Sequence, residues 1–284
     1  MSAVDLHTHS TASDGSLSPA ALVQLAARSG LAAIALTDHD TLAGLAEAEE
    51  AGRLVDLEVI RGCELAARIK DREIHILGLL LPAQTKNLSK SFDQLMLWRM
   101  ERNMGILERL TALNKPINPD EFENFYGSSP LGRPHIAEIM LRKGYVANLR
   151  EAFINYLGER GSAYVPKKTF SPAEIISVLK KDHGLTVLAH PYLLGLSFQE
   201  LQRLLLELKD MGLDGLEAWH SEHPPYIAQS YVALAAKLGL SVSGGSDFHG
   251  LIKPDVALGR VKGGGQVSDK VLVALKKRVA EQFA

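Results

Sequence analysis

The sequence has one cysteine, Cys63, among its 284 residues, so it cannot form an internal disulfide bond. It has no apolar run approaching about 18 residues and no basic and apolar leader after Met1, which favours a soluble, cytoplasmic protein. The formal charge of -2 argues against a protein that coats nucleic acid or membranes through bulk electrostatics. With 46% hydrophobic residues, the chain is able to form a sizeable core.

Several catalytic signatures are also missing. The sequence has no Gly-x-Ser-x-Gly elbow for a serine nucleophile, no Gly-x-Gly-x-x-Gly dinucleotide motif and no Walker loop. A serine triad is therefore a poor explanation of any hydrolytic activity.

Short apolar runs alternate with helical patterns over most of the chain, which is typical of a (β/α) barrel or an open parallel sheet. The predicted strands cover residues 4–6, 32–37, 57–60, 73–81, 185–189, 215–218 and 240–243. A helical segment interrupts this alternation, with helices predicted at 89–113, 134–143 and 149–157 and a strand only at 163–165. We therefore divide the chain into a first barrel part at 1–83, a helical insertion at 84–167 and a second barrel part at 168–284.

The insertion carries 12 basic and 9 acidic residues, whereas the rest of the chain carries 19 and 24. A basic lid suits an anionic substrate. Exposed helices commonly carry Lys and Arg, so the charge alone does not establish such a lid.

Histidine and carboxylate residues gather at the predicted strand ends. His7 and His9 lie two apart, so both imidazoles leave the same side of an extended backbone. The other such residues are Asp14, Asp38, His39, Glu64, His75, His190, Glu217, His220, Asp247 and His249. Singly, each has an ordinary explanation: His75 alternates in an apolar strand like a core histidine, and the residues from Glu217 to His223 could form a polar rim loop. Because the carboxyl ends of parallel barrel strands share one face, the coincidence predicts a multi-metal site.

Imidazole and carboxylate ligands without a thiolate cluster suit manganese, zinc, iron or nickel. The candidate ligands are too many for one ion, so we expect two or three ions that share a bridging carboxylate. Such clusters activate water and bind the oxygens of a phosphoester during in-line displacement.

Five motifs together resemble the PHP (polymerase and histidinol phosphatase) family of metal-dependent phosphoesterases. They are His7-Thr-His9 with Ser13-Asp14-Gly15, Thr37-Asp38-His39-Asp40, Gly62-Cys63-Glu64, Ala189-His190-Pro191 and Gly245-Ser246-Asp247-Phe248-His249. The resemblance implies an α/β fold, namely a distorted seven-stranded (β/α) barrel with a helical insertion domain. It also implies three ions, the first bound by His7, His9, Glu64 and Asp247, the second by Glu64, His75 and His190, and the third by Asp14, His39 and His249.

Within the family, the insertion resembles that of nucleoside 3',5'-bisphosphate phosphatases and short-oligonucleotide 5' exoribonucleases, and Gly132-Arg133-Pro134-His135 resembles their substrate-binding motif. We expect Arg133 to hold phosphate through its planar fork. Arg102 belongs to the long helix predicted in the insertion. It either faces the cleft in which Arg133 would hold phosphate or lies on a solvated surface of that helix. His135, or a histidine of the metal site, would protonate the departing ribose oxygen. His190 and Asp247 are the other expected catalytic residues.

The expected function is that of a metal-dependent phosphoric ester hydrolase acting on a nucleotide phosphomonoester: a nucleoside 3',5'-bisphosphate, AMP or a short oligonucleotide. Manganese is the expected metal, with zinc, iron and magnesium as alternatives. Duplex nucleic acid and membranes are not expected partners, and the sequence leaves the oligomeric state open. Two other interpretations stay open: a histidinol-phosphatase-like enzyme acting on a small metabolite, and a non-catalytic metal-bound module.

Overall fold

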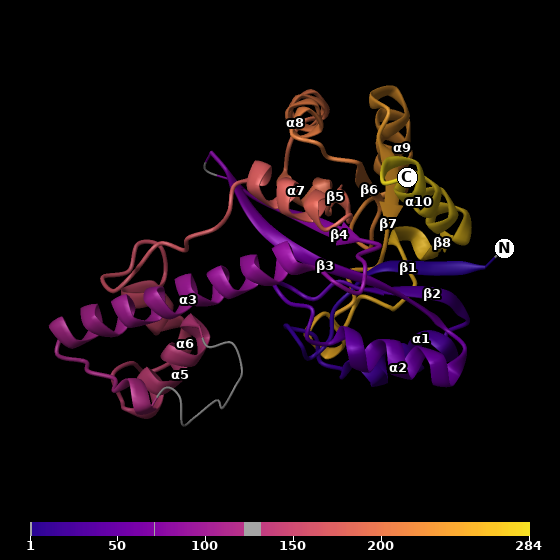
Figure 1. The fold of residues 1–284 in the computed structure, drawn as a ribbon. Helices are drawn as coiled ribbons and strands as arrows, with labels where there is room; N and C mark the ends of the chain where they lie inside the picture. Colours follow the sequence, from indigo (N-terminus) through magenta and orange to yellow (C-terminus); the bar gives the residue numbers. More distant parts are fainter. Residues whose placement is uncertain (1, 71, 122–131) are drawn as a thin grey trace. The chain divides into compact units, whose positions relative to one another are not determined.

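The computed structural model describes residues 2–70, 72–121 and 132–284. The chain folds into two compact units. Residues Met1–Ser89 and Phe170–Ala284 form the first, and residues Lys90–Thr169 form the second (Figure 1).

An eight-stranded sheet forms the frame of the first unit. In chain order its strands are β1 (Ala3–Thr8), β2 (Leu31–Leu36), β3 (Glu58–Ile69), β4 (Arg72–Leu79), β5 (Leu185–Leu188), β6 (Gly215–Trp219), β7 (Ser241–Gly244) and β8 (Val267–Ser268). They follow the order β7-β6-β5-β4-β3-β2-β1-β8 across the sheet. The expected barrel of alternating strands and helices is confirmed, but the expected count of seven was one strand short. The extra strand, β8, has only two residues and pairs antiparallel with β1, so no periodic pattern marks it.

The sheet closes on itself through the segment after β7. Thr8 of β1 forms a parallel bridge with Phe248. The Asp247 amide donates to the His7 carbonyl at 2.9 Å, and the His9 amide donates to the Phe248 carbonyl at 2.9 Å. This pairing places the chain around Asp247 directly beside the end of β1.

One strand runs against the others in the region of the site. The strand β4 is antiparallel to both β3 and β5, whereas β1, β2 and β3 pair in parallel, as do β5, β6 and β7. Parallel barrel strands were expected, and β4 departs from that expectation. The amino-terminal half of β4 consequently lies beside the carboxyl-terminal half of β3, with His75 opposite Ala66.

Helices cover the outside of the sheet. They are α1 (Pro19–Arg28), α2 (Leu45–Val55), α7 (Pro172–Lys181), α8 (Phe198–Asp210), α9 (Pro225–Leu238) and α10 (Asp269–Gln282), with short 3-10 turns η2 (Pro191–Leu194), η3 (Gly250–Ile252) and η4 (Lys262–Gly264). Side-chain caps mark the starts of several of them. Ser18 accepts a hydrogen bond from the Ala21 amide at the start of α1, and Ser171 forms a capping box with Glu174 at the start of α7.

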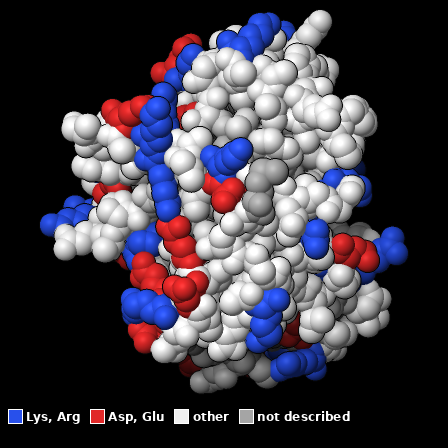
Figure 2. All heavy atoms as spheres, turned by 90° about the vertical axis from the view of Figure 1, so that its right-hand side faces the viewer, with Lys and Arg blue, Asp and Glu red and all other residues white. Residues whose placement is uncertain are grey.

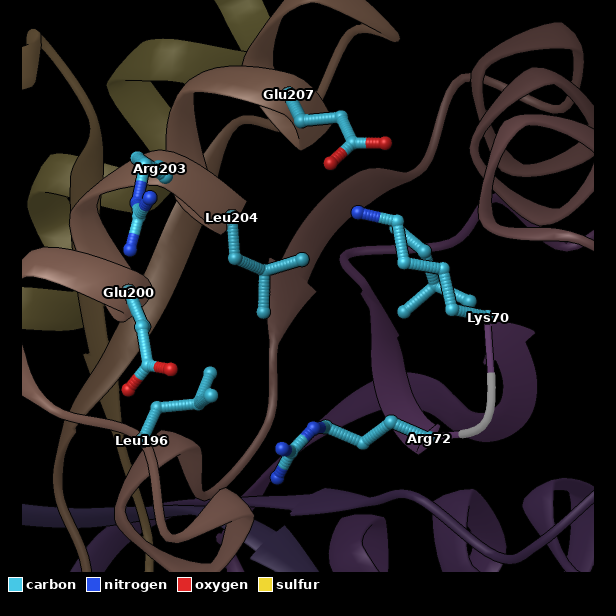
Figure 3. Close-up of a pocket in the computed structure, with 8 residues that line it drawn as sticks. Lys70, Arg72, Leu196, Glu200, Arg203, Leu204 and Glu207 are labelled. Atoms are coloured by element: carbon cyan, nitrogen blue, oxygen red, sulfur yellow. The ribbon is translucent and has the colours of Figure 1, made fainter.

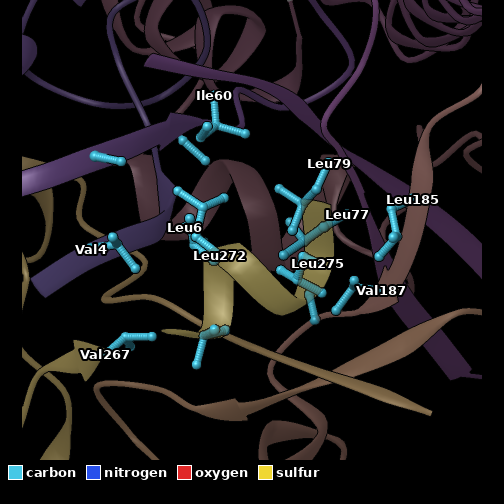
Figure 4. Packing of buried hydrophobic residues seen from close by; sticks show 14 residues of the cluster. Val4, Leu6, Ile60, Leu77, Leu79, Leu185, Val187, Val267, Leu272 and Leu275 are labelled. Carbon is cyan, nitrogen blue, oxygen red and sulfur yellow. The ribbon is translucent and has the colours of Figure 1, made fainter. Parts of the chain in front are cut away.

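Apolar side chains fill the inside of the sheet, and Figure 4 shows them converging from several strands and from α10. The cluster consists of Val4, Leu6, Ala33, Ala35, Ile60, Leu77, Leu79, Leu185, Val187, Ala189, Val267, Val271, Leu272 and Leu275. On β4 the members alternate, and the next position in that alternation is His75. The polar site therefore begins where the apolar core ends.

The surface of the described residues carries mixed charge. On the face in Figure 2, basic and acidic side chains are scattered among broad uncharged areas, and neither sign covers the face. None of the described helices is long and apolar enough to cross a membrane.

The second unit is helical in the part that the structure describes. Its helices are α3 (Lys86–Ala112, with its first residues in the first unit), α5 (Arg133–Arg142), α6 (Leu149–Ala152) and the π-helical η1 (Phe153–Leu157). Its core contains Ile106, Leu110, Ile136, Met140 and Leu157. The strand predicted at 163–165 is absent. Two of its carbonyls instead accept hydrogen bonds from arginine side chains: Arg102 donates to Val165 at 2.8 Å, and Arg109 donates to Tyr164.

Candidate metal centre

Glu64, a buried residue of β3, lies at the middle of the candidate site. Its Oε2 atom lies within 3.4 Å of ring nitrogens of three histidines, and its Oε1 atom lies within 2.9 Å of ring nitrogens of two more. The three are His7 (3.2 Å), His9 (3.2 Å) and His39 (3.4 Å), and the two are His75 (2.7 Å) and His190 (2.9 Å). One carboxylate thus faces five imidazoles, which is the arrangement expected of a group that bridges two cations.

Two aspartates extend the site on either side. Oδ1 of Asp247 lies 3.3 Å from Nε2 of His9. Oδ1 of Asp14 lies 3.3 Å from Nε2 of His249, and its Oδ2 lies 3.9 Å from Nε2 of His39. The structure therefore brings all nine predicted metal ligands together, and we call them the ligand cluster: His7, His9, Asp14, His39, Glu64, His75, His190, Asp247 and His249.

Potential ligand atoms in and beside the cluster fall into compact groups, within each of which they lie no more than 4.8 Å apart. The groups are His7, His9, Glu64 and Asp247; His9, Asp14, His39 and His249; His39, Glu64 and His75; and His7, Glu217 and His220. The first agrees with the first expected ion site. The second contains the third expected site and adds His9.

Strand direction explains how His75 joins the cluster. In the β3–β4 pair, Glu64 stands opposite Leu77, and His75 lies two residues before Leu77 on the same face. The His75 carbonyl also accepts from the Ala189 amide at 3.0 Å, beside His190 on the chain that leaves β5. The antiparallel β4 therefore brings a residue near its own beginning to the edge where the neighbouring strands end.

Buried nitrogens test whether the cluster suits metal ions. Both ring nitrogens of His9 and Nδ1 of His190 are buried and lack a hydrogen-bond partner. A buried polar atom without a partner is costly, and a divalent cation would be a partner for the lone pair of the His9 ring. The donor set of imidazoles and carboxylates fits manganese, zinc or iron.

Two ligands are held in unusual backbone conformations. His190 has φ 28° and Asp247 has φ 57°, in the left-handed region that side chains with a Cβ rarely adopt. Gly245, two residues before Asp247, packs so closely on β1 that an added Cβ would lie 2.4 Å from the His7 amide nitrogen. The surrounding structure therefore fixes these ligands tightly.

Mutual charge interactions shape the ionisation of the cluster. Burial opposes ionisation of Glu64, but the charges of His7 and His39 and its hydrogen bonds hold its pKa well below the usual range. Burial lowers the pKa of His39 to about 4, despite the charge of Glu64. Burial would also lower the pKa of His75, but hydrogen bonds to Glu64 and Glu73 raise it to about 9. The carboxylates are therefore charged at neutral pH and able to bind cations.

The structure also places beside the cluster residues that the sequence did not assign to an ion. Glu217 is buried, and its Oε1 atom lies 3.0 Å from Nδ1 of His7. Nε2 of His220 lies 3.5 Å from Oδ2 of Asp247. Lys253 donates to the same Asp247 oxygen at 2.6 Å. The only signal in the sequence was the position of Glu217 and His220 at the end of a predicted strand.

Asp38, one of the acidic residues at the predicted strand ends, holds the loop that carries Asp14. Its Oδ1 accepts from the Ser10 amide at 2.7 Å and from the Ser13 hydroxyl at 2.6 Å. Its Oδ2 accepts from the Ser10 hydroxyl at 2.7 Å. Asp38 therefore anchors this loop.

The predicted substrate residues lie in the second unit. Arg133 opens α5, donates to the Leu157 carbonyl at 3.2 Å and stacks over the Phe153 ring. Arg102 is half-buried, and burial and then the charge of Arg133 lower its pKa. Nδ1 of His135 accepts from the Gly132 amide at 3.1 Å, at the start of α5. The two arginines are thus close enough to repel each other.

A separate hollow of about 710 Å³ lies in the first unit between the β3–β4 hairpin and α8 (Figure 3). Its described lining residues are Ile69, Lys70, Arg72, Leu196, Glu200, Arg203, Leu204 and Glu207. None of them belongs to the ligand cluster, so this hollow is distinct from the candidate metal centre.

Comparison with known proteins decides the family. Residues 5–179 match the PHP domain family. The chain belongs to the PHP domain family. This PHP protein is 33% identical to the 5'-3' exoribonuclease of Haemophilus influenzae over 245 residues, which cover 86% of this chain and 89% of the relative. It is 29% identical to the 3',5'-nucleoside bisphosphate phosphatase of Chromobacterium violaceum, with 88% of each chain covered.

Other comparisons agree with this family. The chain is 30% identical to a phosphoribosyl 1,2-cyclic phosphate 1,2-diphosphodiesterase of Eggerthella lenta, over 87% of this chain and 94% of the relative. Among solved structures, a Bifidobacterium adolescentis protein assigned as a metal-dependent phosphoesterase has a TM-score of 0.76 and 31% identity, with 98% of this chain and 96% of that chain covered. This PHP protein is a metal-dependent phosphoesterase, as the sequence predicted.

Proposed function

We propose that this PHP phosphoesterase hydrolyses a phosphomonoester of a nucleotide: a nucleoside 3',5'-bisphosphate, AMP or a short oligonucleotide. The observation that carries the proposal is the position of Glu64, whose carboxylate lies within 3.4 Å of ring nitrogens of five histidines. The bisphosphate phosphatase and exoribonuclease relatives support a nucleotide as the substrate class.

The ligand cluster would hold two or three divalent ions, with manganese as the expected metal and zinc, iron or magnesium as alternatives. His7, His9, Glu64 and Asp247 would hold one ion, His75 and His190 with Glu64 a second, and Asp14, His39 and His249 a third. When bound, such ions supply the positive charge that activates water and stabilises phosphoryl oxygens.

The protein groups at the site have separate tasks. Burial opposes ionisation of Asp247, but the charge of His7 and the nearby rings of His220 and His9 hold its pKa far below its usual range. It is therefore a weak base that orients the attacking water by accepting a hydrogen bond. His190 and His135 are the candidates to donate a proton to the departing ribose oxygen.

The second unit would act as the specificity lid, and its arginines suit phosphate. Arg102 and Arg133 lie close enough that the charge of one lowers the pKa of the other. An oxyanion between two guanidinium groups would relieve this repulsion and accept charge-assisted hydrogen bonds. We assign Arg133 and Arg102 to the phosphate that is not cleaved.

A substrate panel tests the proposal. We would measure kcat/KM for phosphate release with manganese on adenosine 3',5'-bisphosphate, AMP, a 5'-phosphorylated short oligoribonucleotide and histidinol phosphate. We expect the nucleotides to be the better substrates by at least about tenfold, which corresponds to about 1.4 kcal/mol in the barrier. A preference for histidinol phosphate would instead make the protein a small-metabolite phosphatase.

A cyclic phosphodiester is the second candidate substrate. The Eggerthella lenta diphosphodiesterase is 30% identical to this chain, and the match covers 94% of that relative. Adding phosphoribosyl 1,2-cyclic phosphate to the panel therefore separates the two activities. Faster turnover of the cyclic compound than of any monoester would assign the protein as a phosphodiesterase.

A further inference from the structure

Glu217 has no place among the nine ligands, yet it is fully buried beside them. It lies on β6 with a relative exposure of 0%. Its Oε1 atom lies 3.0 Å from Nδ1 of His7, and its Oε2 atom accepts from the His190 backbone amide at 2.7 Å. One carboxylate therefore contacts two members of the ligand cluster that are far apart in the sequence.

The contact with His7 fixes which nitrogen of that ring is able to bind a metal. An ionised carboxylate only accepts hydrogen bonds, so Nδ1 of His7 must carry the proton. The lone pair of the neutral ring is then on Nε2, which lies 3.2 Å from Glu64 and 3.5 Å from Asp247. A carboxylate behind a metal-binding histidine orients the ring and raises its basicity.

The contact with His190 acts on the backbone. His190 has φ 28° and ψ 56°, and the following turn, η2, begins directly after it. The hydrogen bond from its amide to Glu217 holds this unusual conformation, from which Nε2 reaches Oε1 of Glu64 at 2.9 Å. A backbone anchor at this point fixes where the imidazole lies.

We propose that Glu217 is the positioning residue of this metal centre: it sets the tautomer of His7 and anchors the backbone of His190. The inference rests on the proposed binding of metal by the ligand cluster. Neighbouring His220 has no such ligand role, although it belongs to a compact group with His7 and Glu217. Its Nδ1 accepts from the Glu222 amide at 3.1 Å, so the proton of the neutral ring is on Nε2, which points at Asp247.

Glutamine at position 217 is a sharp probe because it has nearly the same shape. The carboxylate accepts with both oxygens, one for His7 and one for His190. An amide has a single acceptor oxygen, so Glu217→Gln must place its NH₂ group against one of the two N–H donors. Losing such a partner behind a metal ligand typically lowers metal affinity by about 10- to 100-fold.

The matched control is Asp214→Asn, just before the start of β6. Asp214 is also buried, with an exposure of 2%, but it binds Lys180 and Thr186 and contacts no member of the ligand cluster. We would strip both variants with a chelator and titrate them with Mn²⁺. We expect weaker Mn²⁺ binding only in Glu217→Gln, and a lower Tm without weaker binding in Asp214→Asn. Equal Mn²⁺ affinity in folded Glu217→Gln and wild type would overturn the proposal.

A measurement on the wild-type protein covers the case in which Glu217→Gln does not fold. Long-range proton–nitrogen spectra of the zinc-loaded protein, with His7 assigned through its backbone, report which ring nitrogen is protonated. We expect a proton on Nδ1 and zinc on Nε2, and zinc on Nδ1 would overturn the proposal. Failure of wild-type protein to bind Mn²⁺ or Zn²⁺ would refute the metal centre itself, so the two failures are distinguishable.

Discussion

Oε1 of Glu64 lies 2.7 Å from Nδ1 of His75, across the antiparallel pair formed by β3 and β4. The contact depends on the direction of β4, because only in an antiparallel pair does the beginning of one strand meet the end of its neighbour. The same alternation carries Leu77 and Leu79 into the apolar core. Residues on one face of β4 thus contribute both to the apolar core, through Leu77 and Leu79, and to the polar centre, through His75.

Replacing the central carboxylate should remove metal as well as activity. Glu64→Gln keeps the shape but puts a neutral amide among five imidazoles, and an amide is a poor bridge between cations. We expect at least one ion fewer per chain and at least about a hundredfold lower kcat, since losing a charge-assisted interaction that stabilises a transition state costs about 3 kcal/mol. Elemental analysis and steady-state kinetics measure both effects.

The control for this change is Glu58→Gln, on the same strand. Glu58 is exposed and pairs with Lys276 at the surface. Its metal content and kcat should match those of wild type. Full metal content in Glu64→Gln would show that Glu64 does not bridge the ions.

The metal-free protein should lose stability as the pH rises from 6.5 through 9. Burial opposes the charge on His75, but contacts with Glu64 and Glu73 raise its pKa to about 9 in the folded protein. A raised pKa contributes stability that is fully present below the unfolded value of 6.5 and is lost as the pH passes the folded value. His39, whose pKa burial lowers to about 4, is neutral throughout this range. Thermal unfolding of chelated protein at several pH values is the measurement, and a Tm that rises with pH would contradict it.

Local patterns predicted the alternation of strands and helices, because buried strands and capped amphipathic helices each leave a signal within a few residues. The start of α7 is an example, where Ser171 and Glu174 form the capping box. The direction of β4 had no such signal, since an apolar alternating run reads the same in either direction. The strand β8 was too short to detect, with only Val267 and Ser268.

At the site, the sequence predicted the metal ligands but not the residues that support them. The ligand cluster was identifiable because metal-ligating residue types recur at strand ends. The role of Glu217 was not, because its partner His7 is 210 residues away and only the folded sheet brings them together. Residues 163–165 have a β-like composition, but the carbonyl of Val165 is bound by the side chain of Arg102.

We expect the Arg133→Lys variant to lose activity although it keeps the positive charge. If Arg133 binds phosphate bidentately, Arg133→Lys keeps the charge and loses the planar fork. A charge-assisted contact is worth roughly 1.5 to 3 kcal/mol, or about a tenfold to hundredfold loss in kcat/KM. We expect this loss on adenosine 3',5'-bisphosphate and nearly normal kinetics on AMP, because the assigned phosphate is the uncleaved one.

Arg142→Lys is the control for this helix. Arg142 is the last residue of α5 and pairs at the surface with Glu138 at 4.0 Å. Its kinetics should match wild type. If kcat/KM of Arg133→Lys falls equally on both substrates, Arg133 binds the reacting phosphate. Wild-type kinetics on both substrates would show that Arg133 is not part of the site.

Removing the second unit should separate metal binding from specificity. All nine members of the ligand cluster lie outside Lys90–Thr169. A chain in which a short flexible linker replaces this range should keep its ions and still hydrolyse an aryl phosphate. Its kcat/KM on adenosine 3',5'-bisphosphate should fall by a factor at least about tenfold greater than its kcat/KM on the aryl phosphate. Equal losses on both substrates would show that the unit supports folding and not substrate choice.

The most direct test of the account is phosphate release from adenosine 3',5'-bisphosphate by chelated wild-type protein, measured before and after Mn²⁺ is added, with the bound ions counted. The account predicts background release without metal, and recovery as two or three ions bind per chain. Glu64→Gln should not recover under the same conditions. Full activity in the metal-free protein, or no activity on any nucleotide after the ions have bound, would contradict a metal-dependent nucleotide phosphoesterase.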